Sequence, residues 1–506
     1  MLLDKANTNP SDARAMSKKK GRRKGFTPRS EDFSAWYNEV VLQAELADYS
    51  PARGSMVIRP WGFGIWENMQ RALDDMFKAT GHENAYFPLL IPMSFIEREK
   101  EHVAGFKPEL AVVTHAGGKE LEEPYVVRPT SETIIYAMYA KWVQSYRDLP
   151  ILLNQWCNVM RWELRTRLFL RTAEFLWQEG HTAHATADEA EAEARTILGV
   201  YRSFMEDWIA MPPVTGLKSE SEKFAGAVRS YACEALMQDG KALQAGTSHM
   251  LGQNFARQFG LRFQSEQGRE EYAWNTSWGV STRLVGGMVM THGDDGGVVV
   301  PPRLAPTQVV VVPIARNDDQ QAIVVERAAA IVAELKRRGV RAAMDDRMHL
   351  SPGAKFFEWE RKGLPVRVEV GPRDVERGEV VVAPRVTAEG RPRKEAVPEG
   401  EAIGAMAARL ERLQTRLREA ARARREDDTY RGEISSIEEL EDLLDGGVGF
   451  VYSGWSGDPS VEARVKEATM ATIRVIPGEE FRSAMPPTRC VGGGQAQMEV
   501  VWARAY

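Results

Sequence analysis

The sequence predicts a multidomain protein: an α+β domain built on an antiparallel sheet, followed by two smaller α/β pieces. Its 506 residues exceed one domain, since about 100–200 residues per domain is usual. Before residue 300, extended stretches follow one another around loops rather than alternating with helices. After Pro301-Pro302, strands and helices alternate, which favours a small α/β domain with a mostly parallel sheet.

The composition excludes several classes of protein. Hydrophobic content of 43% and charged content of 27% are typical of a soluble globular chain. The formal net charge of -5 gives no general attraction to nucleic acid, so such binding requires a local basic patch. No apolar run reaches the ~18–20 residues of a membrane span. The three cysteines are scattered and odd in number (Cys157, Cys233 and Cys490), which indicates a reducing cytoplasm.

Residues 1–29 are polar and contain a basic block at 18–24. We expect a disordered tail here, and the alternative is a segment that contacts RNA phosphates. The first globular elements follow: apolar residues at helical spacing predict a helix over Trp66–Phe77, ending near Gly81. Tyr86–Ile91 reads as a strand, and its internal Pro88 suggests an edge strand at a subunit contact.

Residues 151–162 and 173–182 predict a pair of antiparallel strands joined by a basic tip. The capping box Thr186-Ala187-Asp188-Glu189 predicts a helix that runs through Trp208. Residues 272–300 are rich in glycine, tryptophan and β-branched side chains, as a central antiparallel sheet would be.

The second half of the chain gives shorter elements. We expect strands at 308–314, 340–344, 365–370 and 379–383, a helix over 318–338, and a long helix over 403–426 with a 3-4-3-4 apolar seam. Residues 427–506 read as a compact α/β piece. The resulting domain boundaries are 30–301, 302–402 and 403–506, with the long helix opening the last.

Four side chains point to nucleotide chemistry through their order and spacing: Arg161, Glu163, Phe175 and Arg283. An α-phosphate under attack needs a fixed positive charge, and arginine stays charged while its planar fork grips two oxygens. An aromatic face and a guanidinium plane can sandwich a purine. Together these residues predict a site for a bent ATP molecule.

The same residues resemble the signature motifs of class II aminoacyl-tRNA synthetases. Arg161-x-Glu163 with Phe175 and Glu179 resembles the second motif, Gly279–Arg283 the third, and Gly62–Pro88 the first, dimer-forming motif. Further stretches look like the prolyl-tRNA synthetase family in particular: Arg128-Pro129-Thr130-Ser131-Glu132, Trp177-Gln178-Glu179-Gly180-His181, Ser221-Glu222-Lys223-Phe224-Ala225-Gly226, and Trp278-Gly279-Val280-Ser281-Thr282-Arg283. Thr282 stands where many class II enzymes carry an acid, a change that prolyl enzymes share.

The resemblance implies ATP-dependent attachment of L-proline to tRNA(Pro) in two steps, through a prolyl-adenylate. It implies catalytic roles for Arg161 and Arg283, proline contacts by Thr130, Glu132, Arg161, His181, Ser277, Trp278 and Gly279, and ATP contacts by Arg161, Glu163, Phe175, Gln244, Thr247 and Arg283. His249 would lie near the ribose or the amino acid. Mg²⁺ would assist, with Glu179 as a possible ligand. Arg165, Arg167, Arg171, Arg347 and Lys355 are weaker candidates for tRNA contacts. A homodimer is also implied.

Two expectations concern what is absent. Short prolyl enzymes can carry four zinc-binding cysteines near the C-terminus, whereas Ser456, Ser460 and Gly493 stand about where three would be and only Cys490 remains. One thiolate cannot build a tetrahedral zinc site, so we expect no zinc. Residues 182–276 leave no room for an inserted editing domain. Alanine lacks two methylenes of proline, which gives only about tenfold discrimination, so a separate trans-editing protein is a possible partner.

Three alternatives remain open at this point. A synthetase-like paralogue without catalysis would not need the four nucleotide residues, and a structural interaction protein would not need converging polar residues. A threonyl- or seryl-type enzyme is the third, and the Cys and His zinc ligands of threonyl enzymes are missing. The terminal Tyr506 resembles that of short prolyl enzymes, where it turns toward the active site.

Overall fold

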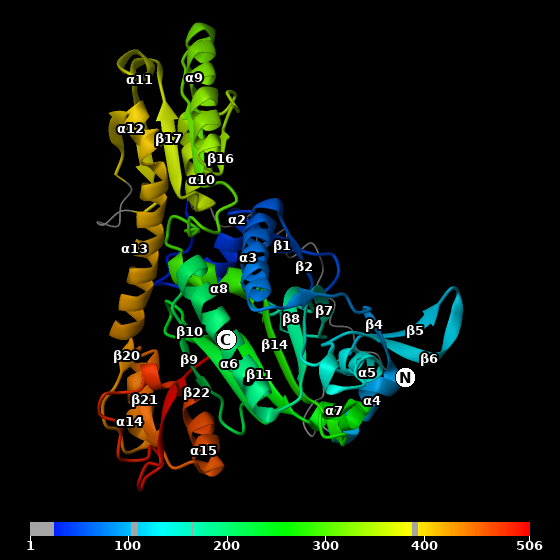
Figure 1. The fold of residues 1–506 in the computed structure, drawn as a ribbon. Coiled ribbons are helices and arrows are strands. Elements are labelled where there is room, and N and C mark those ends of the chain that lie inside the picture. Colours follow the sequence, from blue (N-terminus) through cyan, green and yellow to red (C-terminus); the bar gives the residue numbers. More distant parts are fainter. Residues whose placement is uncertain (1–24, 103–109, 164, 387–392) are drawn as a thin grey trace, which may run out of the picture.

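An eleven-stranded sheet is the centre of the protein (Figure 1). The computed structural model describes residues 25–102, 110–163, 165–386 and 393–506. Neighbouring strands are antiparallel except at the two ends, where β3 pairs with β7 and β20 with β21 in parallel. The strand order is β20 (Thr429–Tyr430), β21 (Phe450–Trp455), β23 (Met498–Ala503), β22 (Thr472–Pro477), β9 (Val214–Leu217), β10 (Arg229–Leu236), β11 (Ala242–Gly252), β14 (Trp274–Ser281), β8 (Glu174–His184), β7 (Ile151–Met160) and β3 (Glu83–Asn84).

The local predictions for this domain are largely confirmed. Strands β7 and β8 pair antiparallel from Ile151↔Ala183 to Met160↔Glu174, with the basic tip between them. Thr186 caps the next helix through the predicted capping box with Glu189. Four helices cover one face of the sheet and share its largest apolar core: α2 (Phe33–Gln43), α3 (Pro60–Ala79), α6 (Ala187–Phe204, extended by the π-helical turn η2, Met205–Ile209) and α8 (Arg283–His292).

Two strand predictions were wrong. Of the stretch 86–91, only Leu90 and Ile91 belong to a strand, β4 (Leu90–Pro92). Before it, side chains occupy the backbone of Phe87, because Gln155 Oε1 accepts from Phe87 N and Arg128 Nη1 donates to Phe87 O. β4 joins β6 (Lys119–Val127) and β5 (Val112–Ala116) in a three-stranded sheet. Residues 283–292 form helix α8 rather than sheet, and its Gly286 allows close packing, since a Cβ there would lie 2.6 Å from Leu170.

The second domain has a five-stranded sheet in the order β16-β15-β17-β18-β19. Strand β15 is parallel to β16 and β17, but β17–β18 and β18–β19 are antiparallel, so the predicted mostly parallel sheet is mixed. The elements are β15 (Val309–Pro313), α9 (Asp318–Arg337), β16 (Ala342–Met344), α10 (Pro352–Arg361), β17 (Val366–Val370), α11 (Pro372–Arg377), β18 (Glu379–Pro384), β19 (Glu395–Pro398), α12 (Glu399–Gly404) and the long α13 (Met406–Asp427).

The sequence pattern suggested a separate C-terminal piece, but this region joins the catalytic sheet. Its strand β22 pairs with β9 of the catalytic sheet, at Ile476↔Leu217 and Pro477↔Gly216. Gly216 is required for this approach, because a Cβ there would lie 2.2 Å from the Ile476 oxygen. Helices α14 (Ile437–Asp445) and α15 (Pro459–Thr469) complete this region. Smaller elements are β1 (Ala47–Tyr49), β2 (Met56–Ile58), α4 (Met93–His102), α5 (Glu132–Trp142), η1 (Tyr146–Asp148), α7 (Asn254–Phe259), β12 (Arg262–Gln264), β13 (Glu270–Tyr272) and η3 (Glu479–Phe481).

The predicted tail is shorter than 29 residues. Phe26 is buried, and Arg29 forms an ion pair with Asp295, so residues 25–29 pack on the globular body. Residues 1–24, with the basic block, lie outside the described residues. Among the helices of the described residues, none combines the length and the apolar character that crossing a membrane requires.

Candidate active site

A cavity of about 290 Å³ lies on the sheet face opposite the apolar helices. Alternate residues of a strand point to one face, so Phe175, Trp177, Glu179 and His181 of β8 line it together. The pairing register aligns His181 with Ser277 and Ser277 with His249 across three strands. Two residues further along the same strands, Gly279 is paired with both Glu179 and Thr247. Gly279 has no side chain to fill the cavity.

The structure brings all the residues predicted to bind proline and ATP to this cavity. Its lining includes Thr130, Glu132, Arg161, Glu163, Phe175, His181, Gln244, Thr247, Ser277, Trp278, Gly279 and Arg283. Glu179, His249 and Arg171 line it as well. Residues as far apart in the sequence as Thr130 and Arg283 therefore line one cavity, and β8, β14 and β11, which form its floor, are neighbours in the sheet.

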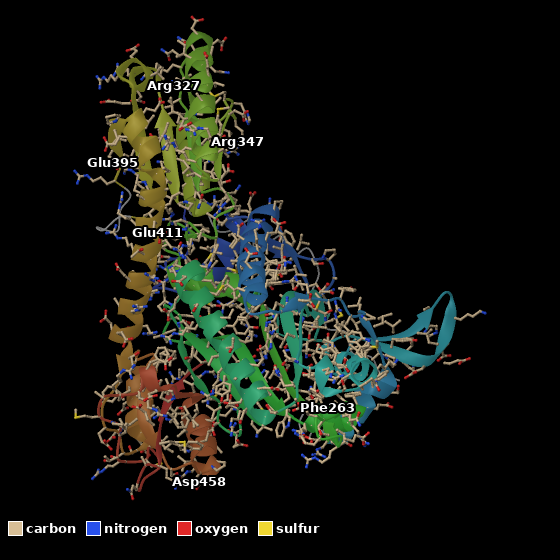
Figure 2. All side chains as sticks on the ribbon, in the orientation of Figure 1. Phe263, Arg327, Arg347, Glu395, Glu411 and Asp458 are labelled. Atoms are coloured by element: carbon tan, nitrogen blue, oxygen red, sulfur yellow. The ribbon has the colours of Figure 1, made fainter. Side chains whose placement is uncertain are left out.

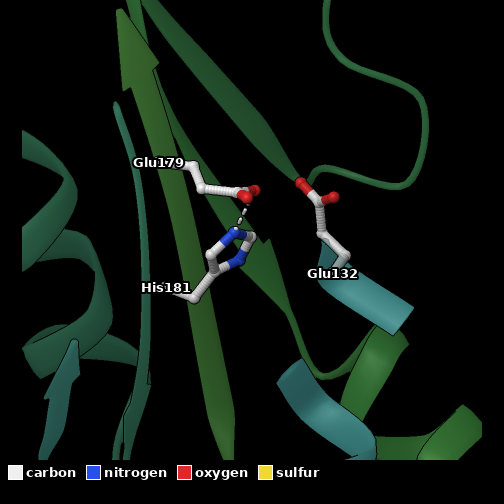
Figure 3. A group of neighbouring side chains, drawn as sticks. All are labelled: Glu132, Glu179 and His181. Carbon is white, nitrogen blue, oxygen red and sulfur yellow. Dashed lines mark hydrogen bonds and ion pairs between the residues drawn. The ribbon is translucent and has the colours of Figure 1, made fainter. Parts of the chain in front are cut away.

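One end of the cavity is acidic (Figure 3). Glu132 is buried in the first turn of α5 and accepts a hydrogen bond from the Thr130 hydroxyl. Across the gap, His181 Nε2 lies 2.9 Å from Glu179 Oε2, and ligand atoms of these three residues lie within 4.8 Å of one another. Burial opposes a charged imidazole, but the Glu179 and Glu132 carboxylates raise the pKa of His181 above its ordinary value. A protonated His181 leaves a net charge of −1, which matches one small cation.

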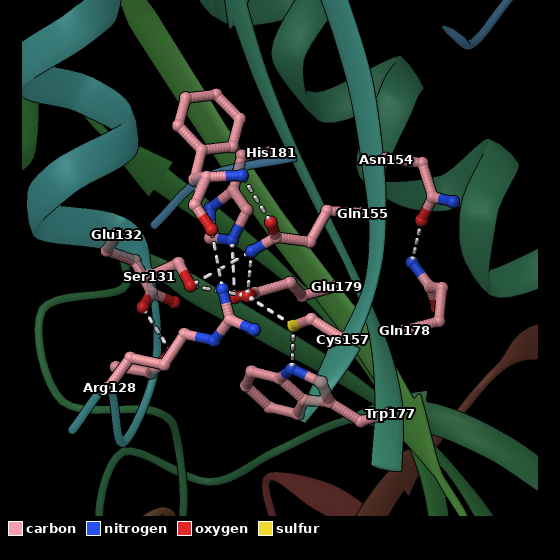
Figure 4. A network of polar contacts seen from close by, with 12 residues as sticks. Arg128, Ser131, Glu132, Asn154, Gln155, Cys157, Trp177, Gln178, Glu179 and His181 are labelled. Atoms are coloured by element: carbon pink, nitrogen blue, oxygen red, sulfur yellow. Dashed lines mark hydrogen bonds and ion pairs between the residues drawn. The ribbon is translucent and has the colours of Figure 1, made fainter. Parts of the chain in front are cut away.

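Glu179, predicted as a possible magnesium ligand, accepts hydrogen bonds from several residues of the protein itself. Figure 4 shows its carboxylate at the centre of a polar network. Oε1 accepts from Ser131 Oγ and, at 2.7 Å, from Gln155 Nε2, while Oε2 meets His181. Burial raises the pKa of Glu179, yet these donors and the His181 charge bring it below its ordinary value. The donors occupy Oε1, whereas the described partner of Oε2 is His181, which this carboxylate orients.

The other end of the cavity is cationic. Arg161 donates through Nε to the Pro129 oxygen at 3.0 Å, and its guanidinium lies 5.6 Å from the Phe175 ring centre. Arg283 begins α8 and donates to the Leu170 oxygen at 3.2 Å. Burial lowers the pKa of both arginines, and for Arg283 the Arg161 and Arg171 charges lower it further, but arginine remains charged at neutral pH. A cation at a helix N-terminus opposes the helix dipole, which indicates a functional rather than a stabilising role.

Within the described part of the chain, the buried atoms His181 Nδ1 and Ser277 Oγ of the cavity wall have no hydrogen-bond partner. Such atoms are rare in protein interiors because an unpaired buried group loses its hydration without compensation. The two residues are directly paired across β8 and β14, so both atoms belong to the same end of the cavity. They are the donors and acceptors that a bound polar ligand would satisfy.

Three of the predicted contact residues lie in environments that the sequence did not indicate. The Trp278 ring points away from the cavity, since it alternates with Ser277 and Gly279, and its centre lies 5.0 Å from that of Phe77 in the core. Lys355 is buried and donates to the Asp345 oxygen at 2.9 Å, so it cannot contact tRNA. Arg347 lies in the second domain (Figure 2), where Asp345 and Glu358 already neutralise it.

The arginines of the basic tip lie in different environments. Arg165 and Arg171 are exposed, and Arg171 pairs with Glu163 at 3.2 Å. The Arg167 guanidinium lies 4.7 Å from the Tyr37 ring centre and 5.4 Å from that of Tyr506. Tyr506 thus lines a second pocket of about 300 Å³ next to the cavity, together with Arg165, Thr166, Arg167, Leu170, Arg171 and Arg283.

Sequence reasoning gave no role to a further part of the wall, formed by Lys218, Glu222, Phe224 and Ser230. The signal was present, because Ser221–Gly226 is one of the stretches that resemble prolyl enzymes. His249 stacks on Phe224 at 4.8 Å between ring centres. Burial, with the His181 and Lys218 charges, lowers the pKa of His249 to about 3, so this imidazole is neutral at physiological pH.

Comparisons with known proteins agree with this geometry. Residues 110–292 match the tRNA synthetase class II core domain (G, H, P, S and T), residues 308–409 an anticodon binding domain, and residues 437–506 the C-terminal domain of prolyl-tRNA synthetase. The chain is 54% identical to the proline–tRNA ligase of Chlorobium luteolum, over 95% of this chain and 99% of that one. It is 55% identical to that of a Roseiflexus species, over 96% and 100%.

A solved structure is similar over the same extent. The crystal structure of prolyl-tRNA synthetase from Cryptosporidium parvum, complexed with halofuginone and AMPPNP, superposes with a TM-score of 0.88 at 39% sequence identity. The match covers 95% of this chain and 99% of that one. The chain belongs to the prolyl-tRNA synthetase family.

Proposed function

We propose that the acidic end of the cavity holds L-proline and the cationic end holds ATP, so that the two react between them. As a member of its family, the protein attaches proline to tRNA at the expense of ATP, through a prolyl-adenylate. The observation that supports the arrangement is the division of one 290 Å³ cavity into an end with Glu132 and an end with Arg161 and Arg283.

At the proline end, the charged secondary amine would lie between Glu132 and Thr130. His181 Nδ1 and Ser277 Oγ, which have no protein partner, are available to the same ligand. The net charge of −1 at this end, with His181 protonated, balances the single positive charge of the amine. A pocket built to pair an ammonium group leaves its acid unpaired when a ligand without that group binds, which is a strong source of selectivity.

At the ATP end, Phe175 and Arg283 would stack on the adenine, and Glu163 would accept from its amino group. Gln244 and Thr247 lie on β11, on the ribose side. Arg161 stands between the two ends and would bind both the proline carboxylate and the α-phosphate. Both reactants are anions, so a fixed cation between them lowers the Coulomb cost of their approach and orients them for attack.

Magnesium would reach the site with ATP, bound to its phosphate oxygens. Oε1 of Glu179 already accepts from Ser131 and Gln155, and Glu163 pairs with Arg171, whereas ligand atoms of Glu132, Glu179 and His181 lie close enough together to hold an ion. We assign no step to a protein-bound metal. No zinc is proposed, since the buried Cys490 has no second thiolate near it among the described residues.

The remaining assignments follow from the resemblance. We propose domains at 30–301, 302–402 and 403–506, a cytoplasmic homodimer formed through residues 62–88, and tRNA contacts by Arg165, Arg167 and Arg171. Exposed Phe63 and Tyr86 support the dimer surface. Residues 182–276 form α6, β9 to β13 and α7 within the catalytic domain, so no editing domain is inserted there. Correction of mischarged alanine would then fall to a trans-editing protein.

Proline-dependent exchange of labelled pyrophosphate into ATP tests the proposal. The purified protein is assayed without tRNA, beside threonine, serine and alanine as alternative substrates. We expect exchange with proline at the highest kcat/KM and slower exchange with alanine, since burial of two methylenes discriminates by only about tenfold. Faster exchange with threonine or serine, or none with any of the four, would contradict the assignment and favour one of the alternatives.

A further inference from the structure

The segment Lys218–Phe224, between β9 and β10, forms one wall of the cavity and is attached to the C-terminal domain by three side chains. Lys218, Glu222 and Phe224 line the cavity. Figure 1 shows β22 and α15 of the C-terminal domain beside β9 and β10. The C-terminal domain therefore lies directly behind this wall.

The first attachment is a buried charge cluster. Glu234 on β10 is fully buried, and its Oε1 lies 2.8 Å from Lys218 Nζ. Arg474 on β22 approaches the same carboxylate from the C-terminal domain, with Nε 3.0 Å from Oε2 and Nη2 3.1 Å from Oε1. Burying three charged groups costs desolvation energy, and apolar residues in their place would often stabilise the fold equally well. The cluster is better explained by the exact placement it imposes on Lys218.

The second and third attachments come from helix α15. Ser219 Oγ donates to Glu462 Oε1 at 2.7 Å, and both side chains are buried. Lys466 Nζ lies 3.2 Å from Glu222 Oε1 at the surface. Ser219 and Glu222 thus contact α15 directly, and Lys218 is linked to Arg474 through Glu234.

The wall continues directly to the proline end. Phe224 N donates to Ser230 Oγ at 2.9 Å, and Ser230 Oγ lies 2.8 Å from His249 Nδ1. The Phe224 ring stacks on His249, and His249 is paired with Ser277 in the sheet. A displacement of the segment would therefore move the side chains next to Ser277 and His181 before it reached Phe175 or Arg283.

We propose that Arg474 and Glu462 are positioning residues for the proline end of the cavity, acting through Lys218 and Ser219. The C-terminal domain then takes part in proline activation itself, a step that needs no tRNA. This inference rests on the proposed function, because it assigns proline to the Glu132 end.

The test is steady-state pyrophosphate exchange without tRNA, with KM for proline and for ATP measured separately. Arg474→Met keeps an unbranched apolar stem and removes the charge, and Arg474→Lys restores a cation for the Glu234 carboxylate. Arg464→Met is the matched control, because Arg464 is exposed on α15 and its hydrogen bond goes to the Gly492 oxygen, at 3.4 Å, away from the cavity wall. Glu462→Gln provides a second, milder variant should Arg474→Met fail to fold.

We expect Arg474→Met to raise KM for proline by about tenfold, in line with coupling through packed networks, with KM for ATP little changed. Arg474→Lys should recover part of the loss, Glu462→Gln should show a smaller rise, and Arg464→Met should match the wild type. Unchanged proline KM in folded Arg474→Met and Glu462→Gln protein would overturn the inference, as would equal losses for both substrates without rescue by lysine. Wild-type protein that shows no proline-dependent exchange would instead refute the proposed function.

Discussion

The substitution Glu132→Gln separates the binding of proline from the stability of the fold. Glu132 is buried, its described hydrogen-bond partner is the Thr130 hydroxyl, and no cation among the described residues forms an ion pair with it. Glutamine keeps the shape and one acceptor oxygen but removes the charge. The protein without substrate should therefore be no less stable, whereas the bound amine of proline loses its counter-ion.

The structure sets the size of the expected effect. Ligand atoms of Glu132, Glu179 and His181 lie within 4.8 Å of one another, so a cation among them is in contact with Glu132. Two unit charges about 4 Å apart attract by about 4 kcal/mol at an effective dielectric constant near 20. An amide oxygen would retain a neutral hydrogen bond worth about 1 kcal/mol. The difference of about 3 kcal/mol corresponds to a roughly 100-fold loss in affinity.

Pyrophosphate exchange and thermal unfolding measure the two effects. We expect Glu132→Gln to raise KM for proline by roughly 100-fold, to change KM for ATP little, and to leave the melting temperature equal or higher. Glu174→Gln is the control, because Glu174 is exposed at the start of strand β8 and does not line the cavity. A variant that binds proline normally, or that loses stability and both substrates together, would refute the role given to Glu132.

Three further predictions concern other parts of the account. Arg161→Lys should lower kcat for exchange by about 10²–10³-fold at an unchanged melting temperature, since lysine lacks the planar fork that holds two oxygens in fixed positions, and a normal kcat would contradict this. Burial lowers the pKa of His292 to about 3 from 6.5, so stability is lost as pH falls below 6.5, by about 2 kcal/mol at pH 5. Urea unfolding at pH 7 and 5 should show a smaller loss for His292→Gln, and an equal loss would exclude His292 as the cause. Elemental analysis should find substoichiometric zinc, and one zinc per chain would refute the metal-free C-terminal domain.

Local signals account for the features that were predictable from the sequence. The capping box at Thr186 and the pairing of β7 with β8 depend on residues close in the chain, and both are confirmed. The cavity was predictable because the motif spacings fix which side chains of β8 and β14 share a face. The same alternation could have shown that the Trp278 ring points into the core while its neighbours face the cavity.

Features that depend on distant contacts were not predictable. The sheet joins β9 to β22 through residues about 260 positions apart, and nothing in either strand indicates its partner. Glu179 looks like a free acid in the sequence, but Ser131 and Gln155 come from other elements to saturate it. The glycines of α8 were read as part of a sheet, whereas Gly286 and Gly287 allow this helix to pack closely against its neighbours.

The central claim is that proline and ATP share one cavity with fixed orientations. A crystal structure of the protein soaked with L-proline and a non-hydrolysable ATP analogue tests it most directly. The account predicts the proline nitrogen within hydrogen-bond distance of Glu132, the adenine between Phe175 and Arg283, and Arg161 in contact with both ligands. Ligands bound in the reverse order, or a cavity that excludes them at saturating concentration, would contradict it.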